Sequence, residues 1–218
     1  MVILRSMCKA VMLLLLCSIN LVSGKNQIIS QIPITGMEIS EPETLEVQDF
    51  SSFLSEVQTG AVEQITGLYV PDVFAFPVIQ QPPGHPEFVS SSDQELTQFG
   101  MAAEYGSLGL LAHNTLAGEE FSKITPDMLI IVITGDGHYS IYIVKEIRRF
   151  QAYSPFSPYS NFYDLDTGDI LTATDVFRQT YMVQGSVILQ TCIASKGIDN
   201  WGRLFIIATP VSLEPPME

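Results

Sequence analysis

Residues 128–147, MLIIVITGDGHYSIYIVKEI, decide the fold class of this chain. Two runs rich in β-branched residues, 128–134 and 139–147, flank the tripeptide Gly135-Asp136-Gly137. A Gly-Asp-Gly connection between two such runs is typical of a β-hairpin, because these residues tolerate the backbone angles of tight turns. The stretch therefore predicts an antiparallel hairpin within a β domain.

Further short apolar runs lie on both sides of the hairpin, separated by Gly, Pro, Asp and Asn. They cover residues 73–76, 78–79, 108–112, 187–191 and 204–208, and Pro77 separates the first two. A long connection, residues 150–185, is rich in Ser, Pro, Tyr and Asp, with one predicted helical turn after Thr174. Connections of this length in a compact domain are usually functional. Many short strands with few helices predict an all-β domain, either a closed barrel or a sandwich.

The first 24 residues have the plan of a secretory signal peptide. Arg5 and Lys9 precede an apolar stretch of thirteen residues, 10–22, and Val22-Ser23-Gly24 offers a small-residue cleavage site. A bilayer-spanning helix needs about twenty apolar residues, so this stretch is short for one. We expect residues 1–24 to be cleaved, with an uncleaved N-terminal anchor as the alternative. Either form predicts an extracellular or cell-surface protein, secreted or anchored.

The rest of the chain divides near residue 64. Residues 25–63 are acidic and lack strand-like alternation, so we interpret them as a linker that docks at most weakly on the domain. Residues 64–212 form the predicted β domain, and residues 213–218 form a tail. A short amphipathic helix in the linker is predicted by the i, i+3, i+4, i+7 spacing of Phe50, Phe53, Leu54 and Val57.

The charge balance excludes one class of partner. The formal net charge is −14, with 24 acidic against 10 basic residues. Nucleic acid is bound by clustered Lys and Arg, so such a surface repels it. We expect no nucleic-acid partner, and the acidic surface suits an extracellular protein.

Cys192 is the one cysteine that remains when residues 1–24 are removed, because Cys8 and Cys17 lie in that segment. A thiol kept in an oxidising compartment is a liability unless it has a function. Cys192 follows the strand-like residues 188–191. We therefore predict that it is a nucleophile.

A cysteine nucleophile needs a base or a cationic neighbour, and a donor for the oxyanion that forms on the attacked carbonyl. His85 lies in a Pro-rich turn and His138 begins a hairpin strand, whereas His113 follows the apolar run 108–112 where a strand gives way to a loop. Arg203 begins another apolar run.

Cys192, His113 and Arg203, each taken alone, have an ordinary structural explanation. A Cys after a β run is usually part of the core, a His at a strand end is usually a satisfied surface residue, and an Arg in a strand is usually solvated. All three lie at the edges of apolar strands, with only one thiol outside residues 1–24. This combination favours a catalytic group made of Cys192, His113 and Arg203.

Three segments, in this order, resemble the sortases, cysteine transpeptidases of bacterial surfaces. Leu111-Ala112-His113 is similar to the family's His element, although Ala112 and Asn114 stand where the family often has Gly and Arg. Leu189-Gln190-Thr191-Cys192 is similar to the Leu-x-Thr-Cys strand end, with Ile188 in place of a Thr. Residues 201–208 are similar to the Arg strand. The hairpin 129–150 and Phe121 also fit, so the resemblance covers about residues 65–212.

The resemblance implies a closed sortase-type β-barrel of about eight strands with one or two short helices. It implies that Cys192 attacks the Thr carbonyl of a Leu-Pro-x-Thr-Gly-like sorting motif and forms a thioester. His113 would give a proton to the leaving glycine amine and later deprotonate the incoming nucleophile. Arg203 would hold the substrate backbone and the oxyanion, a task that suits its always-charged planar donor.

The same resemblance implies the partners and the substrate contacts. The expected partners are a peptide or protein that carries the sorting motif and an amine acceptor, which is cell wall or pilin-like. No cofactor is expected. Connection 150–185 would wall the groove, and its aromatic residues would line an apolar slot or, alternatively, hold the loop on the barrel. These aromatic residues are Phe156, Tyr159, Phe162 and Tyr163. The substrate-binding residues are predicted to be Ala112, Thr191, Phe162 and Tyr163.

Two other functions stay open from the sequence. One is a thiol hydrolase that cleaves the same motif without transfer to an amine. The other is a catalytically silent barrel that acts as a surface-binding module.

Ile32-Pro33-Ile34-Thr35-Gly36 reads as a sorting-type motif inside the chain's own linker. One hypothesis is that this segment visits the groove as a pseudosubstrate or is itself a joining site. The alternative is a proline-containing linker.

The acidic residues 164–169 resemble the start of an EF-hand loop. Asp169 occupies the position that needs glycine, and no bidentate Glu follows. We therefore predict a turn with solvated carboxylates. A cysteine-rich zinc site is not expected either, and no metal is predicted.

Overall fold

The computed structural model describes residues 48–157 and 159–211. Eight strands in this part of the chain close into a barrel in the order β10-β9-β4-β3-β2-β1-β5-β6, and β6 pairs with β10 to complete the ring. The barrel is mixed, because β2–β3 and β4–β9 are parallel and the other pairs are antiparallel. The predicted all-β closed barrel of about eight strands is confirmed, and the sandwich is excluded.

The barrel strands are β1 (Ile65–Val70), β2 (Phe74–Gln80), β3 (Leu96–Phe99), β4 (Leu108–Leu111), β5 (Leu129–Thr134), β6 (Tyr139–Ala152), β9 (Val187–Ser195) and β10 (Ile198–Pro210). Two short strands outside it are β7 (Phe162–Asp164) and β8 (Ile170–Leu171). The helices are α2 (Phe50–Val57), α3 (Gly100–Glu104), α4 (Ala173–Tyr181) and the 3₁₀-helix η1 (Ala117–Lys123). The described residues thus contain more short helices than the one or two predicted. A helix of five residues such as α3 is too short to show a readable apolar period in the sequence.

The hairpin predicted from residues 128–147 is confirmed as β5 and β6, with Leu129 opposite Ile143 and Ile133 opposite Tyr139. The predicted break at Pro77 is wrong, because β2 is one strand that continues through it. Pro77 pairs with Gly67 of β1, while the pairing with β3 begins only at Val78. A proline is tolerated at such a position because it lies outside the ladder on that side.

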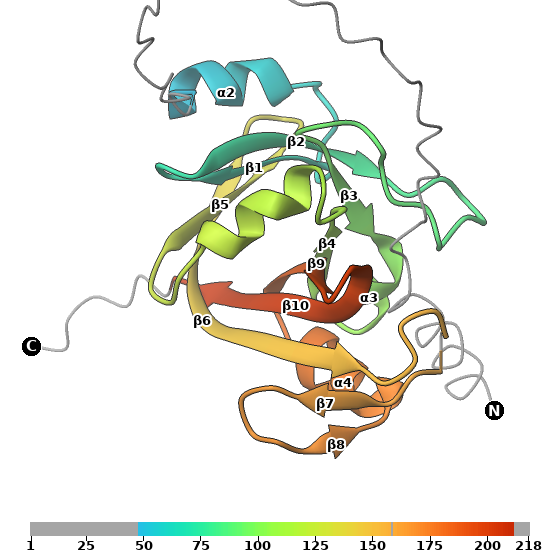
Figure 1. Cartoon of the computed structure of the whole chain (residues 1–218). Helices are drawn as coiled ribbons and strands as arrows, with labels where there is room; N and C mark the ends of the chain where they lie inside the picture. The colour runs from blue at the N-terminus through green and yellow to red at the C-terminus, as the bar shows by residue number, and fades with distance from the viewer. Residues whose placement is uncertain (1–47, 158, 212–218) are drawn as a thin grey trace, which may run out of the picture.

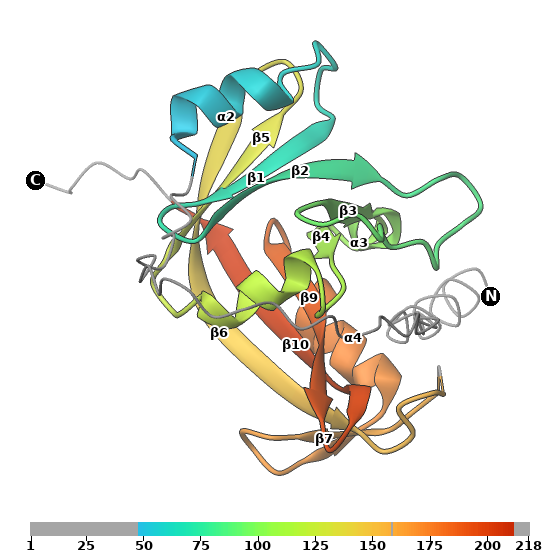
Figure 2. The same cartoon turned by 45° about the horizontal axis from the view of Figure 1, so that its top comes forward.

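Alternate residues of β9 and β10 enter two different cores. Leu189 and Ile206 point into the barrel, where they belong to the interior cluster. Ile188 and Phe205 point outward, into a second cluster with Phe177 of α4. This alternation follows from the two-residue period of a strand. Figures 1 and 2 show α4 and β7 together on this outer side of the barrel, away from α2.

The predicted amphipathic helix is confirmed as α2, which begins after the N-cap Asp49. Phe53 and Val57 are buried against Ile133 of β5. Gly67 of β1 permits this contact, since a Cβ there would lie 2.9 Å from Val57 Cγ2. The last part of the predicted linker therefore packs on the barrel (Figure 1).

Several sequence predictions fall outside the described residues. They are the signal peptide 1–24, the motif 32–36 and the tail 213–218. Within the described residues, no helix has the length and apolar character to cross a membrane.

Connection 150–185 contains β7, β8 and α4. The predicted helical turn is confirmed and extended to nine residues, with a capping box between Thr172 and Asp175. The prediction that the carboxylates of turn 164–169 are solvated is wrong for Asp164, which is buried. It accepts hydrogen bonds from the backbone of Asp166 and Thr167 and pairs with Arg148 at 2.9 Å. These partners hold its pKa below the ordinary value although burial opposes this shift.

Candidate functional site

Strand pairing brings the three predicted catalytic residues together. On β9, Cys192 lies directly opposite Arg203 of β10. On the other side of β9, Leu111 of β4 pairs with Gln190, and the next amide, that of Ala112, donates to the Gln190 carbonyl at 3.2 Å. His113 continues this parallel register by two residues, so it lies beside Cys192.

The three side chains lie on the same face of the sheet. Cys192 follows Ile188 by four residues, and Arg203 precedes Phe205 by two, so both share the outer face on which these two residues pack. His113 has the same relation to Leu111. All three are buried, with exposed fractions of 6% for Cys192, 6% for His113 and 1% for Arg203.

His113 is held by both its backbone and its ring. Its carbonyl accepts hydrogen bonds from the amides of Leu116 and Gly118, each at 3.0 Å. Burial lowers the pKa of its imidazole below the ordinary 6.5, and a hydrogen bond with the Val89 backbone opposes this shift only in part. The imidazole is therefore neutral at neutral pH and able to accept a proton. The exposed His85 and His138 instead lie beside the carboxylates of Glu87 and Asp136.

Arg203 is a fully buried cation. Its Nη1 donates to the carbonyl oxygens of Asn200, at 2.9 Å, and Gly202, at 2.7 Å. Burial lowers its pKa to about 10, so the guanidinium stays charged at neutral pH. The two carbonyls fix the orientation of its planar guanidinium.

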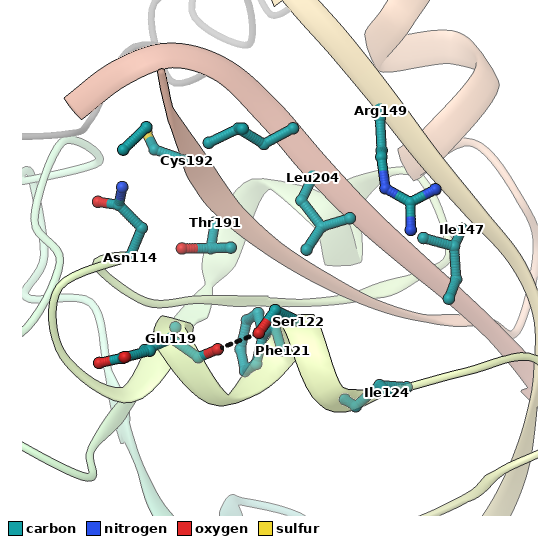
Figure 3. A pocket seen from close by; sticks show the side chains of 13 residues that line it. Asn114, Glu119, Phe121, Ser122, Ile124, Ile147, Arg149, Thr191, Cys192 and Leu204 are labelled. Atoms are coloured by element: carbon teal, nitrogen blue, oxygen red, sulfur yellow. Dashed lines mark hydrogen bonds between the residues drawn. The ribbon is translucent and has the colours of Figure 1, made fainter. Parts of the chain in front are cut away.

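A cavity of about 330 Å³ lies next to Cys192 (Figure 3). Apolar side chains form much of its lining, among them Phe121, Ile147 and Leu204. Glu119 and Arg149 add opposite charges to this lining. Cys192 and Thr191 line the cavity, whereas His113 and Arg203 do not. It therefore lies beside the three-residue group rather than between its members.

The predicted substrate-binding residues occupy different environments. Thr191 is buried, lines the cavity and donates to the Ala112 carbonyl at 2.9 Å, which ties the ends of β4 and β9 together. Phe162 is 1% exposed and packs against Phe150. Tyr163 points the other way and is 37% exposed. The burial of Phe162 agrees with the alternative that the aromatic residues of this connection hold it on the barrel. Phe156 and Tyr159 are exposed.

Three residues that support the site were not singled out from the sequence. Gly118 lets η1 approach the strand ends, because a Cβ there would lie 2.3 Å from Thr191 Oγ1 and 2.7 Å from the His113 carbonyl. Asn114 donates to the Asp199 carbonyl at 3.0 Å, joining the loop after β4 to the start of β10. The buried Tyr181 hydroxyl of α4 donates to Gln190 at 2.6 Å. No local sequence signal marks these residues, since each meets its partner only when the strands and helices pack together.

The described residues contain no cluster of metal-binding side chains. Within residues 48–157 and 159–211, no three His, Cys, Asp or Glu side chains lie close enough to hold a metal ion.

Comparisons with known proteins find similarity in structure alone. No family model matches the chain, and no curated protein sequence does. Sortase A from Corynebacterium diphtheriae is 15% identical with a TM-score of 0.44, over 71% of this chain and 63% of that one. Sortase C1 of GBS Pilus Island 1 is 15% identical with a TM-score of 0.43, over 70% and 67%. Listeria monocytogenes sortase A is 13% identical with a TM-score of 0.42, over 68% and 88%.

The chain thus covers less than two thirds of the Corynebacterium structure. These structures are sortases, the family that the sequence resembles. At such identities and TM-scores, the chemistry of this chain has to be argued from its own side chains.

Proposed function

We propose that this chain is a cell-surface cysteine transpeptidase. It cleaves a Leu-Pro-x-Thr-Gly-like motif between Thr and Gly through a thioester on Cys192 and transfers the acyl group to an amine. The observation that carries the proposal is that Cys192 pairs with Arg203 on one side, while on the other side Ala112, the residue before His113, hydrogen-bonds to Gln190 and Thr191.

The first half of the reaction uses all three side chains. In the reduced protein, the Cys192 sulfur attacks the Thr carbonyl carbon, its proton passes to the neutral His113 imidazole and a C–S bond forms. Arg203 stabilises the oxyanion of the tetrahedral intermediate with its fixed positive charge. Collapse breaks the C–N bond, and His113 returns the proton to the leaving glycine amine.

The second half reverses these roles. The incoming amine attacks the thioester carbonyl and gives its proton to His113, while Arg203 again holds the oxyanion. The C–S bond then breaks, the sulfur regains a proton through His113, and a new amide bond is released. Water in place of the amine would give the hydrolase reaction instead.

The test is product analysis by mass spectrometry. The reduced protein is incubated with a Leu-Pro-x-Thr-Gly peptide, with and without triglycine as amine. A ligated product supports the transpeptidase, and a free acid in both reactions supports the hydrolase. An intact peptide, with Cys192 shown by thiol titration to be reduced, would support the silent barrel.

Matched variants assign the activity to the site. Cys192→Ala should lose all turnover, and turnover that survives this change would refute the mechanism. His113→Ala should lose it nearly as fully. His138→Ala, which removes an exposed histidine of the β5–β6 turn, should keep full activity.

The proposal extends to the chain's own motif, Ile32-Pro33-Ile34-Thr35-Gly36. It has the proline and the Thr-Gly bond that the proposed reaction requires. We infer that this segment enters the Cys192 site as a pseudosubstrate or as a joining site. Mass spectrometry of the mature protein should show a thioester or a ligated product at Thr35. Neither product, together with no gain of activity on deleting residues 25–47, would exclude the idea.

A further inference from the structure

A second cavity, of about 450 Å³, lies at the other end of the barrel. The parallel strands β4 and β9 begin there, at Leu108 and Val187, and run toward His113 and Cys192. Five residue steps along the chain lead from Leu108 to His113, a distance of about 16 Å at about 3.3 Å per residue. This far mouth is therefore separate from the proposed catalytic site.

Several hydrogen-bond acceptors lie at the far mouth. Gln98 Oε1 is buried and has no hydrogen-bond partner among the described residues. The hydroxyls of Ser107, Ser186 and Thr134 also line the cavity, but each donates its hydrogen to a protein oxygen. Their acceptors are the Tyr181 carbonyl, the Val183 carbonyl and the Asp136 carboxylate. These three hydroxyls therefore offer only lone pairs to a ligand.

A buried acceptor that stays unsatisfied costs free energy, so the buried Gln98 Oε1 is best explained by a donor that the described residues do not supply. The remaining chemistry of the cavity indicates which donor. Glu63 contributes a carboxylate, and Asp136 lies beside the lining residue His138. Among the described residues that line the cavity, none is Lys or Arg. Tyr139 and Tyr142 add aromatic rings, whose faces attract cations. Ile65, Leu108 and Val132 add apolar surface.

We propose that the far mouth binds a small organic cation, an alkylammonium group on a short apolar chain. The ammonium donates to Gln98 Oε1 and to the hydroxyl lone pairs, near the Glu63 charge, and its chain packs on the apolar residues. Three N–H donors and no acceptor make an ammonium complementary to this acceptor-rich lining. Such a cation could be a free amine or the side chain of a lysine.

The test uses n-butylammonium as the probe in an amide NMR titration of the full chain, with n-pentanol as the uncharged probe of similar size. Shifts should map to the amides of Gln98, Ser107 and Ser140. Butylammonium should bind at least tenfold more tightly than pentanol. Equal affinity for the two probes, or shifts elsewhere, would overturn the proposal. A parallel titration with Nα-acetyl-lysine methylamide distinguishes the two sources, since the blocked lysine binds only if its backbone fits at the rim.

Two variants and a matched control sharpen the assignment. Gln98→Leu removes the acceptor at similar volume and should weaken butylammonium binding about tenfold, the loss expected for a charged hydrogen bond. Glu63→Gln should weaken it less. Asp127→Asn removes the same charge near the opposite end of β5 and should change nothing. Unchanged binding in Gln98→Leu, with a native spectrum, would refute the site.

The same titrations in Cys192→Ala should give unchanged affinities. The proposed cation site at the far mouth is therefore tested independently of the proposed transpeptidase.

Discussion

The two ends of the barrel differ in how their polar groups are used. At the Cys192 end, Thr191 is tied to Ala112, and Arg203 to the carbonyls of Asn200 and Gly202. At the far mouth, Gln98 Oε1 is buried without a hydrogen-bond partner in the described part of the chain. Groups that act on a reaction have to be held in place by their neighbours. A group that receives a ligand instead keeps its hydrogen-bonding capacity available.

Among the substitutions at the Cys192 end that keep Cys192 and His113, Arg203→Lys should lower the activity most. A lysine keeps the charge but loses the planar fork that the two carbonyls orient. We expect kcat/KM for the sorting peptide to fall by about 10²- to 10³-fold, as for the loss of an oxyanion donor. The comparison variant is Arg178→Lys, in an exposed side chain of α4.

The two ends should respond separately to this change. Arg178→Lys should leave the rate unchanged, and butylammonium binding at the far mouth should survive both substitutions. A rate for Arg203→Lys within threefold of the parent would remove Arg203 from the mechanism.

Gly118→Ala should disturb the same end through packing. The added methyl would meet Thr191 Oγ1 and the His113 carbonyl, and neither can move without shifting a strand end. We expect a loss of about 1–3 kcal/mol in the free energy of unfolding, measured in urea, together with reduced turnover.

Gly100→Ala is the matched control for this change. Its nearest neighbour would be 3.9 Å away, and it lies in the first turn of α3. It should be neutral or slightly stabilising. Equal effects of the two substitutions would show that η1 tolerates displacement from the strand ends.

The parts of the fold that the sequence predicted are those with local signals. The β5–β6 hairpin has a turn tripeptide between two β-branched runs, and α2 has a readable apolar period. The predicted break at Pro77 is wrong because whether a proline breaks a strand depends on where the neighbouring strand begins. The predicted exposure of Asp164 is wrong because its partner Arg148 is sixteen residues away.

For the candidate site as well, the sequence predicted some features and not others. Cys192, His113 and Arg203 could be proposed from their positions at the ends of apolar runs, and the resemblance supplied their order. Their common face depends on the register of β4, β9 and β10, which only the folded barrel defines. The far mouth had no sequence signal, because Gln98 and Glu63 meet there only after the barrel closes.

Tyr181→Phe should weaken the contact between α4 and β9. The Tyr181 hydroxyl is buried, and burial holds its pKa well above 10, so it donates as a neutral group to Gln190 Oε1. Its removal leaves a buried acceptor unsatisfied two residues before Cys192, which costs about 1–2 kcal/mol. Urea unfolding measures this loss, with the exposed Tyr159→Phe as the neutral control. If only Tyr159→Phe lowered the free energy of unfolding, the inferred contribution of the Tyr181–Gln190 hydrogen bond would be contradicted.

The pH dependence of His113 should give the smallest effect. Its pKa in the folded chain lies below 6.5 because the buried imidazole resists protonation, whereas the unfolded chain takes up the proton near 6.5. The unfolded state therefore binds more protons below pH 6.5, and the free energy of unfolding should fall as pH drops from 6.5 to the lowered pKa. His113→Gln should lose this component, and His138→Gln should retain it.

Activity should follow the same titration. Protonated His113 cannot accept the Cys192 proton, so kcat/KM should decline only on the acid side of pH 6.5. If the acid limb of the parent lay above pH 6.5, a group other than a buried neutral imidazole would be the base, and the Cys192 end would not be preorganised in the way its hydrogen bonds indicate.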